Sequence, residues 1–222
     1  MKNLIKLFEG NRKWAQRVCA EDPDFFSRLA DAQNPEYFWI SCSDSRVATN
    51  RMLDVLPGTV FVHRNVANVV AHSDLNCLSA MQFAVEVLKI KHIILCGHYQ
   101  CGGVRAVQKG TRLGFIDNWL RHVHDVKCRH ELMLQDMPDS DAWRALCELN
   151  VVEQLRNACE TSIVQAAWEK GQELWLHGVI YDLKDGLLHD MQVSAKDQVG
   201  FDARYTATVA GISKRRGVQE PT

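Results

Sequence analysis

Short apolar runs alternate with longer helix-like stretches along most of this chain, and this alternation limits the possible folds more than any other feature. Strands that alternate with helices predict an α/β fold with a mainly parallel central sheet flanked by helices. The last two runs meet at Asp185-Gly186, a dipeptide typical of hairpins, so they should add an antiparallel edge strand. Five runs are predicted to be strands: residues 36–41, 59–64, 92–98, 173–183 and 187–193.

The N-terminal part of the chain contains two helix-like stretches and no strand signal. The first spans residues 3–18 with Gly10 as a possible kink, and the second has Asp22 as a candidate N-cap with Pro23 at the first helical position. A last helix is predicted over residues 201–212. Because no repeat or long linker interrupts the chain, we predict one domain over residues 1–222. It would consist of a helical arm (1–34), an α/β core (35–200) and a C-terminal helix and tail (201–222).

Composition argues against several classes of protein. Hydrophobic residues make up 46% of the chain and charged residues 24%, the balance of an ordinary globular protein. The formal net charge of -1 provides no broad basic surface for nucleic acid, and the short SKRRG run is typical of a solvated tail. The N-terminus lacks the apolar core of a secretory signal, and no stretch of ~18 apolar residues suggests a membrane span. We therefore expect a cytoplasmic protein with neither nucleic acid nor membrane as a partner.

The chain has eight cysteines. In a cytoplasmic protein they are better explained as buried thiols or metal ligands than as a disulfide framework. Cys96 lies inside a predicted strand and should point into the core. Five others lie in helix-like stretches and are expected to fill core or near-surface positions: Cys19, Cys77, Cys128, Cys147 and Cys159.

Residues that can bind a metal follow two of the predicted strands. Cys42 comes directly after the first strand, and His98 and Cys101 come at the end of the third. Ligand sites in open α/β sheets lie beyond the carboxyl ends of the strands, so these side chains would converge if the two strands are neighbours. Two thiolates and a histidine form a known catalytic zinc set with one open position. Gly102 and Gly103 would leave room beside such an ion and could turn backbone N–H groups toward an anion.

The same residues could also have ordinary structural roles. A cysteine after a strand is usually a core residue, and a His-x-x-Cys pair is often uninformative. Two rival chemistries fail on spacing. A phosphatase-type loop needs five residues between Cys and Arg, whereas three separate Cys42 from Arg46 and three separate Cys101 from Arg105. A thioredoxin-like site needs a C-x-x-C pair, which the sequence lacks.

The motifs CSDSR (42–46), HRNVAN (63–68) and GHYQCGG (97–103) together resemble those of the β-class carbonic anhydrases. The likeness extends over nearly the whole chain and includes DLNCLS, DNWL and YDLKDGLL. This resemblance implies a zinc enzyme that hydrates CO2 reversibly to bicarbonate. It also implies a homodimer or homotetramer whose N-terminal helices wrap a partner subunit, and of the two we expect the tetramer. The implied zinc ligands are Cys42, His98 and Cys101, with Asp44 and Arg46 as a dyad beside the metal.

The residue types suit that chemistry. Two thiolates cancel the charge of Zn²⁺, so its water should ionise less readily than at a three-histidine site, and activity should be favoured by alkaline pH. Asp44 can accept a hydrogen from the nucleophile and so aim a lone pair at CO2. Arg46 can hold that carboxylate ionised through a fork-like pair, a role that Lys would fill poorly.

The resemblance also suggests walls for a small, apolar substrate pocket. The amide of Gln33 could donate to the nascent bicarbonate, whereas the apolar candidates could equally be plain core residues. Some of the walls would come from a neighbouring subunit. The candidates besides Gly102 and Gly103 are Gln33, Phe61, Val66, Phe83, Val87 and Tyr205.

One bacterial subset of the family is inhibited by bicarbonate at a second, non-catalytic pocket, and this chain has matching residues in Trp39, Arg64 and Tyr181. An anion there would displace part of the 44–48 loop, and Asp44 would then leave Arg46 and bind zinc. The expected result is a steep loss of activity below about pH 8.

The chain departs from the usual family pattern at three positions near the motifs. Ser41 and Gln100 stand where Gly is common, and Ala48 stands where Pro is usual. None of the three removes a predicted ligand. The rigidity of the 44–48 loop and the shape of the pocket are the properties that they should affect.

Two alternative functions use the same residues. The zinc site could hydrolyse carbonyl sulfide or carbon disulfide behind a restricted entrance. A non-catalytic module could instead close a structural zinc with Asp44 as fourth ligand. Arg46 argues against that module, because a structural site needs no partner that draws the carboxylate away.

Overall fold

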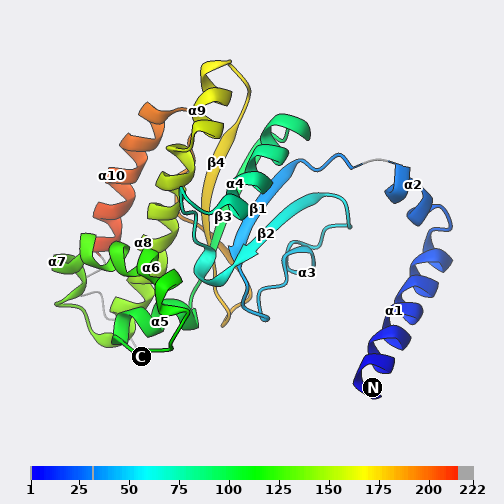
Figure 1. The fold of residues 1–222 in the computed structure, drawn as a ribbon, viewed down its shortest axis with the longest axis horizontal. Coiled ribbons are helices and arrows are strands. Elements are labelled where there is room, and N and C mark those ends of the chain that lie inside the picture. Colours follow the sequence, from blue (N-terminus) through cyan, green and yellow to red (C-terminus); the bar gives the residue numbers. More distant parts are fainter. Residues whose placement is uncertain (1, 32, 215–222) are drawn as a thin grey trace. The chain divides into compact units, whose positions relative to one another are not determined.

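The computed structural model describes residues 2–31 and 33–214 (Figure 1). By its internal contacts the chain divides into two compact units, Met1–Asn34 and Pro35–Thr222. None of the described helices is long and apolar enough to cross a membrane.

The first unit consists of two helices, α1 (Lys2–Glu21) and α2 (Phe25–Asp31). Helix α1 continues through Gly10, and the rings of Trp14 and Phe26 meet edge to face at 5.5 Å between the helices. Helix α2 begins two residues later than predicted, so Pro23 is not its first residue. The Asp22 carboxylate forms an ion pair with Arg28 within this unit.

The second unit contains a five-stranded sheet in the order β2-β1-β3-β4-β5. The first four strands in this order are parallel, and β5 runs antiparallel to β4 at the edge. The predicted α/β fold is therefore confirmed. The strands are β1 (Tyr37–Cys42), β2 (Val60–Asn65), β3 (His92–His98), β4 (Trp175–Tyr181) and β5 (Leu188–Asp190).

Helices and short helical turns connect and cover these strands (Figure 1). The helix that follows β2 changes character along its length, because a regular α-helix gives way to a π-helical turn at Phe83. The helical elements are α3 (Thr49–Leu53), η1 (Val66–Asn68), α4 (Leu75–Gln82), η2 (Phe83–Val87), α5 (Gly102–Lys109), α6 (Asp117–Arg129), α7 (Glu131–Leu134), α8 (Asp139–Cys159), α9 (Ser162–Glu169) and α10 (Gln198–Lys214).

The core lies between the sheet and the long helix α8. Ile40 of β1 and Leu95 of β3 are fully buried, as are Val151 and Leu155 of α8. Gly97 allows α8 to pack closely on the end of β3, because a Cβ atom at this position would collide with the Val151 side chain. The carboxyl ends of β1 and β3 are thus held against a rigid helix, and the candidate site lies at these ends.

Candidate metal centre and active site

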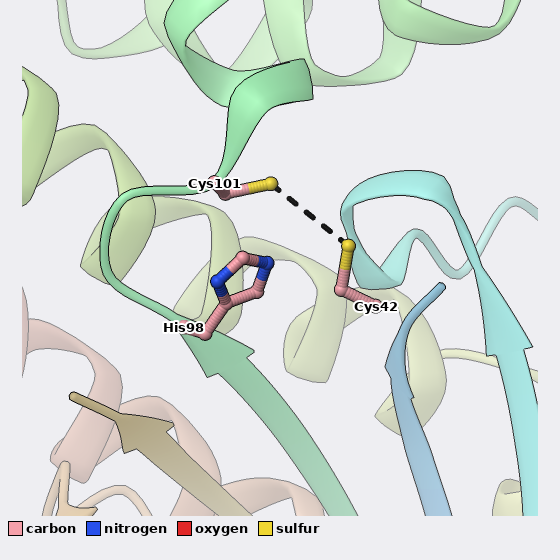
Figure 2. A group of neighbouring side chains, drawn as sticks. All are labelled: Cys42, His98 and Cys101. Carbon is pink, nitrogen blue, oxygen red and sulfur yellow. Dashed lines mark hydrogen bonds between the residues drawn. The ribbon is translucent and has the colours of Figure 1, made fainter. Parts of the chain in front are cut away.

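Three potential metal ligands meet where β1 and β3 end (Figure 2). Cys42 is the last residue of β1, His98 is the last residue of β3, and Cys101 directly precedes α5. Strands β1 and β3 are paired neighbours, which is the condition that the sequence left open. One ligand atom from each side chain lies within 4.8 Å of the other two, and all three residues are buried. We call these residues the central cluster.

The His98 ring is oriented toward the two thiols. Its Nδ1 donates to the backbone carbonyl of Tyr99 at 2.9 Å, which leaves Nε2 as the nitrogen that faces the thiols. This Nε2 is buried and has no hydrogen-bond partner among the residues that the structure describes. The Asp44 Oδ2 atom lies 3.9 Å from it. Buried nitrogens without a partner are costly, so the lone pair is well placed for a ligand that the protein itself does not provide.

The two sulfurs of the central cluster are 4.0 Å apart, within hydrogen-bond distance of each other. A hydrogen bond from the Cys101 thiol lowers the pKa of Cys42, and the resulting thiolate, together with burial, raises the pKa of Cys101. The backbone N–H of Ala67 also points at the Cys42 sulfur, at 3.3 Å. A divalent cation could replace the hydrogen bond between the two sulfurs and bind both as thiolates. Two sulfurs and one imidazole nitrogen therefore fit the donor set of a zinc site.

Helix α8 holds the segment that donates to Cys42. Ala67 has a φ of 65°, in the left-handed region that a residue with a side chain rarely adopts. The Asn150 side chain donates to the Ala67 carbonyl at 2.8 Å. Farther along the helix, Gln154 accepts from the Val70 N–H at 2.8 Å and Asn157 donates to the Val70 carbonyl at 2.9 Å. Three amides on one face of α8 thus fix the strained turn against the central cluster.

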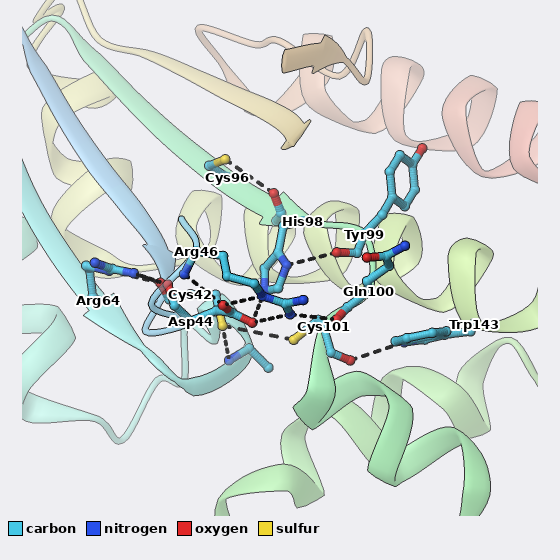
Figure 3. A network of polar contacts seen from close by, with 12 residues as sticks. Cys42, Asp44, Arg46, Arg64, Cys96, His98, Tyr99, Gln100, Cys101 and Trp143 are labelled. Atoms are coloured by element: carbon cyan, nitrogen blue, oxygen red, sulfur yellow. Dashed lines mark hydrogen bonds and ion pairs between the residues drawn. The ribbon is translucent and has the colours of Figure 1, made fainter. Parts of the chain in front are cut away.

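Sequence reasoning did not identify these amides as part of the site. The signal was present as polar residues at helical spacing in a stretch otherwise rich in apolar residues. Trp143 was also missed, although its Nε1 donates to the Cys101 carbonyl at 3.1 Å (Figure 3). That hydrogen bond fixes the backbone of Cys101.

Asp44 and Arg46 form a two-pronged ion pair beside the central cluster (Figure 3). The Arg46 Nε atom donates to Asp44 Oδ1 at 2.9 Å, and Nη2 donates to Oδ2 at 2.7 Å. These hydrogen bonds hold the pKa of the Asp44 carboxyl well below its usual range, so Asp44 is ionised. Arg46 also reaches the Gln100 carbonyl at 3.3 Å, which links the dyad to the loop between His98 and Cys101.

Arg64 binds the backbone of the same loop. Its guanidinium donates to the carbonyl of Cys42, at 2.9 Å from Nε and 2.7 Å from Nη2, and to that of Asp44 at 2.7 Å.

The strand register places Trp39, Arg64 and Tyr181 on one face of the sheet, but β1 and β3 separate Arg64 from Tyr181. Among the described residues, no hydrogen bond joins the three side chains. Two further polar atoms on β1, Trp39 Nε1 and Ser41 Oγ, are buried and have no hydrogen-bond partner among the described residues.

The predicted pocket residues are spread over several elements. Val66 precedes Ala67, and a Cβ atom on Gly103 would lie 3.2 Å from the Val66 side chain, so these two residues line one side of the central cluster. Gly102 begins α5 directly after Cys101. Gln33 is an exposed residue of the first unit, whose placement relative to the site is not defined.

The aromatic and aliphatic candidates lie on other elements of the second unit. Phe61 packs against Phe83, with ring centroids 5.9 Å apart. Phe83 and Val87 are both exposed on η2. The Tyr205 hydroxyl, on α10, donates to Glu153 of α8 at 2.5 Å. In this chain Tyr205 is therefore tied to a buried carboxylate of α8.

Two of the three departures from the family pattern have visible conformational consequences. Gln100 has a φ of 60°, in the left-handed region that suits Gly. Ala48 has a φ of -106°, away from the value of about -65° that a proline ring imposes. Ser41 is fully buried.

Comparisons with known proteins agree on one family. The family model described as "Carbonic anhydrase" matches residues 37–188. A carbonic anhydrase of Emericella nidulans is 46% identical over 189 residues, which is 85% of this chain and 83% of the relative.

Solved structures support the same assignment. The β-carbonic anhydrase of Coccomyxa, solved in complex with acetazolamide, superimposes with a TM-score of 0.85 at 40% identity. The superimposed region covers 89% of this chain and 90% of the Coccomyxa chain. A tetrameric β-carbonic anhydrase of Sordaria macrospora gives a TM-score of 0.83 at 33% identity, covering 88% of this chain and 100% of its own. On the sequence motifs, the fold and these similarities, the chain belongs to the β-class carbonic anhydrases, enzymes that hydrate carbon dioxide.

Proposed function

We propose that the chain hydrates CO2 at a zinc ion held by Cys42, His98 and Cys101. The observation that carries this proposal is the buried His98 Nε2, which has no hydrogen-bond partner among the described residues and lies beside two thiols 4.0 Å apart. When bound, zinc supplies a Lewis acid that makes a water molecule acidic enough to act as a nucleophile near neutral pH. The surrounding protein must then orient that nucleophile and receive the product.

Asp44 is the residue that orients the nucleophile. Its Oδ2 faces the central cluster, and its ionised form can only accept hydrogen bonds. Accepting one from the nucleophile turns an oxygen lone pair toward the substrate. Arg46 keeps Asp44 in place with two parallel hydrogen bonds, which would keep the carboxylate from becoming a further ligand of a bound metal.

The start of α5 is suited to receive the product. The N–H groups in the first turn of a helix have no partner within the helix, and Gly102 and Gly103 occupy these positions directly after Cys101. They can donate to an oxygen that becomes negatively charged during hydration. Val66 supplies an apolar wall next to them, which suits a substrate without a dipole.

We also propose that bicarbonate regulates the enzyme through Arg64, Trp39 and Tyr181. In the present state the guanidinium of Arg64 is engaged with the carbonyls of Cys42 and Asp44. An anion would compete with these carbonyls and release the 44–48 loop. The unpartnered Trp39 Nε1 and Ser41 Oγ are further donors on the same face of the sheet. A released Asp44 could then bind the metal and end catalysis.

A pH series with and without bicarbonate tests this regulation. The expected wild-type profile falls steeply below about pH 8, because acid and bicarbonate both favour the released loop. Arg64→Ala and Tyr181→Phe should flatten the profile while retaining activity at high pH. A shallow one-proton titration that bicarbonate does not change would contradict the regulation, but would leave the hydration activity in place.

Assembly into a tetramer is proposed for a separate reason. Helix α1 presents exposed apolar side chains, including Leu4, Leu7 and Phe8, that need cover. The Sordaria macrospora relative is described as tetrameric. We propose that α1 and α2 pack on a partner subunit. An active monomer by light scattering would contradict this arrangement.

The hydration activity itself is tested by stopped-flow measurement at about pH 8 to 9, with zinc determined on the same sample. Rapid hydration that scales with zinc content is expected. Carbonyl sulfide and carbon disulfide serve as alternative substrates in parallel assays. Hydrolysis of either compound without CO2 hydration would contradict the proposal.

A further inference from the structure

A second group of ligating side chains lies where β2 meets the start of α4. The imidazole of His63, the carboxylate of Asp74 and the thiol of Cys77 each place one ligand atom within 4.8 Å of the other two. We propose that this group, which we call the edge cluster, is a second zinc site. It shares no residue with the central cluster.

Local structure brings the three residues together. His63 lies on β2. Asp74 is the N-cap of α4, and Cys77 follows it by three residues, so the carboxylate and the thiol lie on the same side of the first helical turn. The central cluster uses the same spacing in His98 and Cys101. Each cluster thus combines two residues that are three positions apart in the sequence with one residue from a separate strand.

The present contacts of His63 and Asp74 show what a metal would replace. Burial lowers the pKa of His63, and its Nε2 accepts a hydrogen bond from Asn65 Nδ2 at 3.3 Å, which a metal bound to this nitrogen would displace. Asp74 Oδ1 accepts the N–H of Asn76 at 3.1 Å as the helix cap. In the described part of the chain, no hydrogen bond to Oδ2 and no cationic partner of Asp74 is found. One carboxylate oxygen therefore remains for a cation.

The third side chain is completely buried. Cys77 is enclosed close to the Asp74 carboxylate, so a thiolate at this position needs a cation beside it. A divalent ion with one carboxylate and one thiolate is neutral overall, which limits the cost of burial.

The donor set selects the class of metal. One nitrogen, one oxygen and one sulfur suit zinc and cobalt, whereas magnesium and calcium prefer oxygen donors only. A third group at the β4–β5 hairpin is less suited, because its acids are already engaged. Asp182 binds the Lys184 N–H and pairs with Arg144, and Asp185 binds the Leu187 N–H.

Metal counting tests the edge cluster directly. The background is the full chain with Cys19→Ser and Cys128→Ser, which removes the two exposed thiols. After equilibration with zinc and gel filtration, we expect about two zinc ions per chain, and about one in both Cys77→Ser and Cys42→Ser. Combining Cys77→Ser with Cys42→Ser should remove both. Cys159→Ser, a buried thiol outside either cluster, is the matched control and should leave both in place.

The outcomes separate this proposal from the proposed function. A single zinc ion that Cys42→Ser removes and Cys77→Ser does not would overturn the edge site and leave the central site intact. Because Cys77→Ser could disturb packing, cobalt bound to a Cys42→Ser/Cys101→Ser protein provides a second readout. A thiolate-to-cobalt absorption band that disappears in Asp74→Asn or His63→Gln is expected. Absence of any such band in the parent protein would overturn the proposal.

Discussion

The central and edge clusters contain similar ligands at similar spacing, yet their surroundings affect the thiols in opposite directions. Cys42 receives hydrogen bonds from the Cys101 thiol and the Ala67 N–H, and its pKa is lowered. Cys77 lies near the Asp74 carboxylate in an apolar environment, and its pKa is raised. Proximity of ligand atoms therefore determines whether a metal can bind. The hydrogen-bond donors and charges around the sulfur determine how readily it binds at neutral pH.

Removing a ligand of the central cluster should have the largest effect. Cys101→Ala should lose zinc, reduce CO2 hydration to the background rate and lower the melting temperature, because metal binding contributes on the order of 10 kcal/mol. Metal analysis, stopped-flow kinetics and calorimetry check this outcome. Cys96→Ala is the matched control, since Cys96 is equally buried in β3 but lies outside the central cluster. Full zinc and normal activity in Cys101→Ala would refute the ligand assignment.

Asp44→Asn should separate metal binding from catalysis. The amide preserves the shape of the side chain but loses its negative charge, so zinc should remain while hydration falls by roughly 10²- to 10³-fold. Zinc content and turnover are measured on one sample. Asp54→Asn, on the exposed end of α3, should change neither quantity. An Asp44→Asn protein with wild-type turnover would show that the dyad does not take part in the reaction.

Arg46→Ala should act through Asp44, and its effect on stability should depend on pH. The Asp44 pKa lies below its ordinary value of about 3.9, so the ion pair stabilises the folded state above that pH and stops doing so as pH falls through the lowered pKa. The difference in melting temperature from wild type should be largest near neutral pH and shrink below about pH 4. Chelator-treated protein excludes the contribution of the metal. A difference that is constant with pH would show that another contact is responsible.

The support that α8 gives to Cys42 is tested by Asn150→Leu. Loss of the hydrogen bond to the Ala67 carbonyl should loosen the N–H contact with the Cys42 sulfur and weaken zinc binding by about tenfold, a typical effect of an outer-shell partner. Competition with a chelator measures this affinity. Asn157→Leu removes a comparable bond to Val70, three residues beyond Ala67, and should have a smaller effect. Equal losses would instead indicate general loosening of α8.

The smallest effect is expected at Gln100. A residue with a side chain pays about 1 kcal/mol for this left-handed backbone. Gly avoids that cost, and the avoided cost exceeds the loss of stability that results from the larger conformational entropy of Gly in the unfolded chain. Gln100→Gly should therefore raise the melting temperature by about 1 to 2 °C. Gln135→Gly, at a helical φ of -62°, is the control and should lower it. A decrease in both variants would show that the left-handed backbone is not strained.

The sheet was predictable from the chain because each strand has its own local signal. All five predicted strands are present, and the Asp185-Gly186 signal lies at the β4–β5 connection. Helix boundaries were less predictable, since α2 begins at Phe25 and not at Pro23. The π-helical turn at Phe83 has no local signal either.

The candidate site was predictable only as far as its motifs extend. Their spacing indicated Cys42, His98 and Cys101, but the convergence of these residues depends on β1 and β3 being neighbours, which no local pattern encodes. The hydrogen bond from Asn150 to the Ala67 carbonyl joins residues 83 positions apart. The edge cluster was missed because His63 and Cys77 belong to separate motifs that a family resemblance already explained.

Anomalous diffraction at the zinc absorption edge, recorded from crystals of enzyme active in CO2 hydration, tests the central claim most directly. The account predicts a peak between Cys42 Sγ, His98 Nε2 and Cys101 Sγ, at about 2.3 Å from each sulfur and about 2.0 Å from the nitrogen. Active crystals without a peak at this position would contradict it.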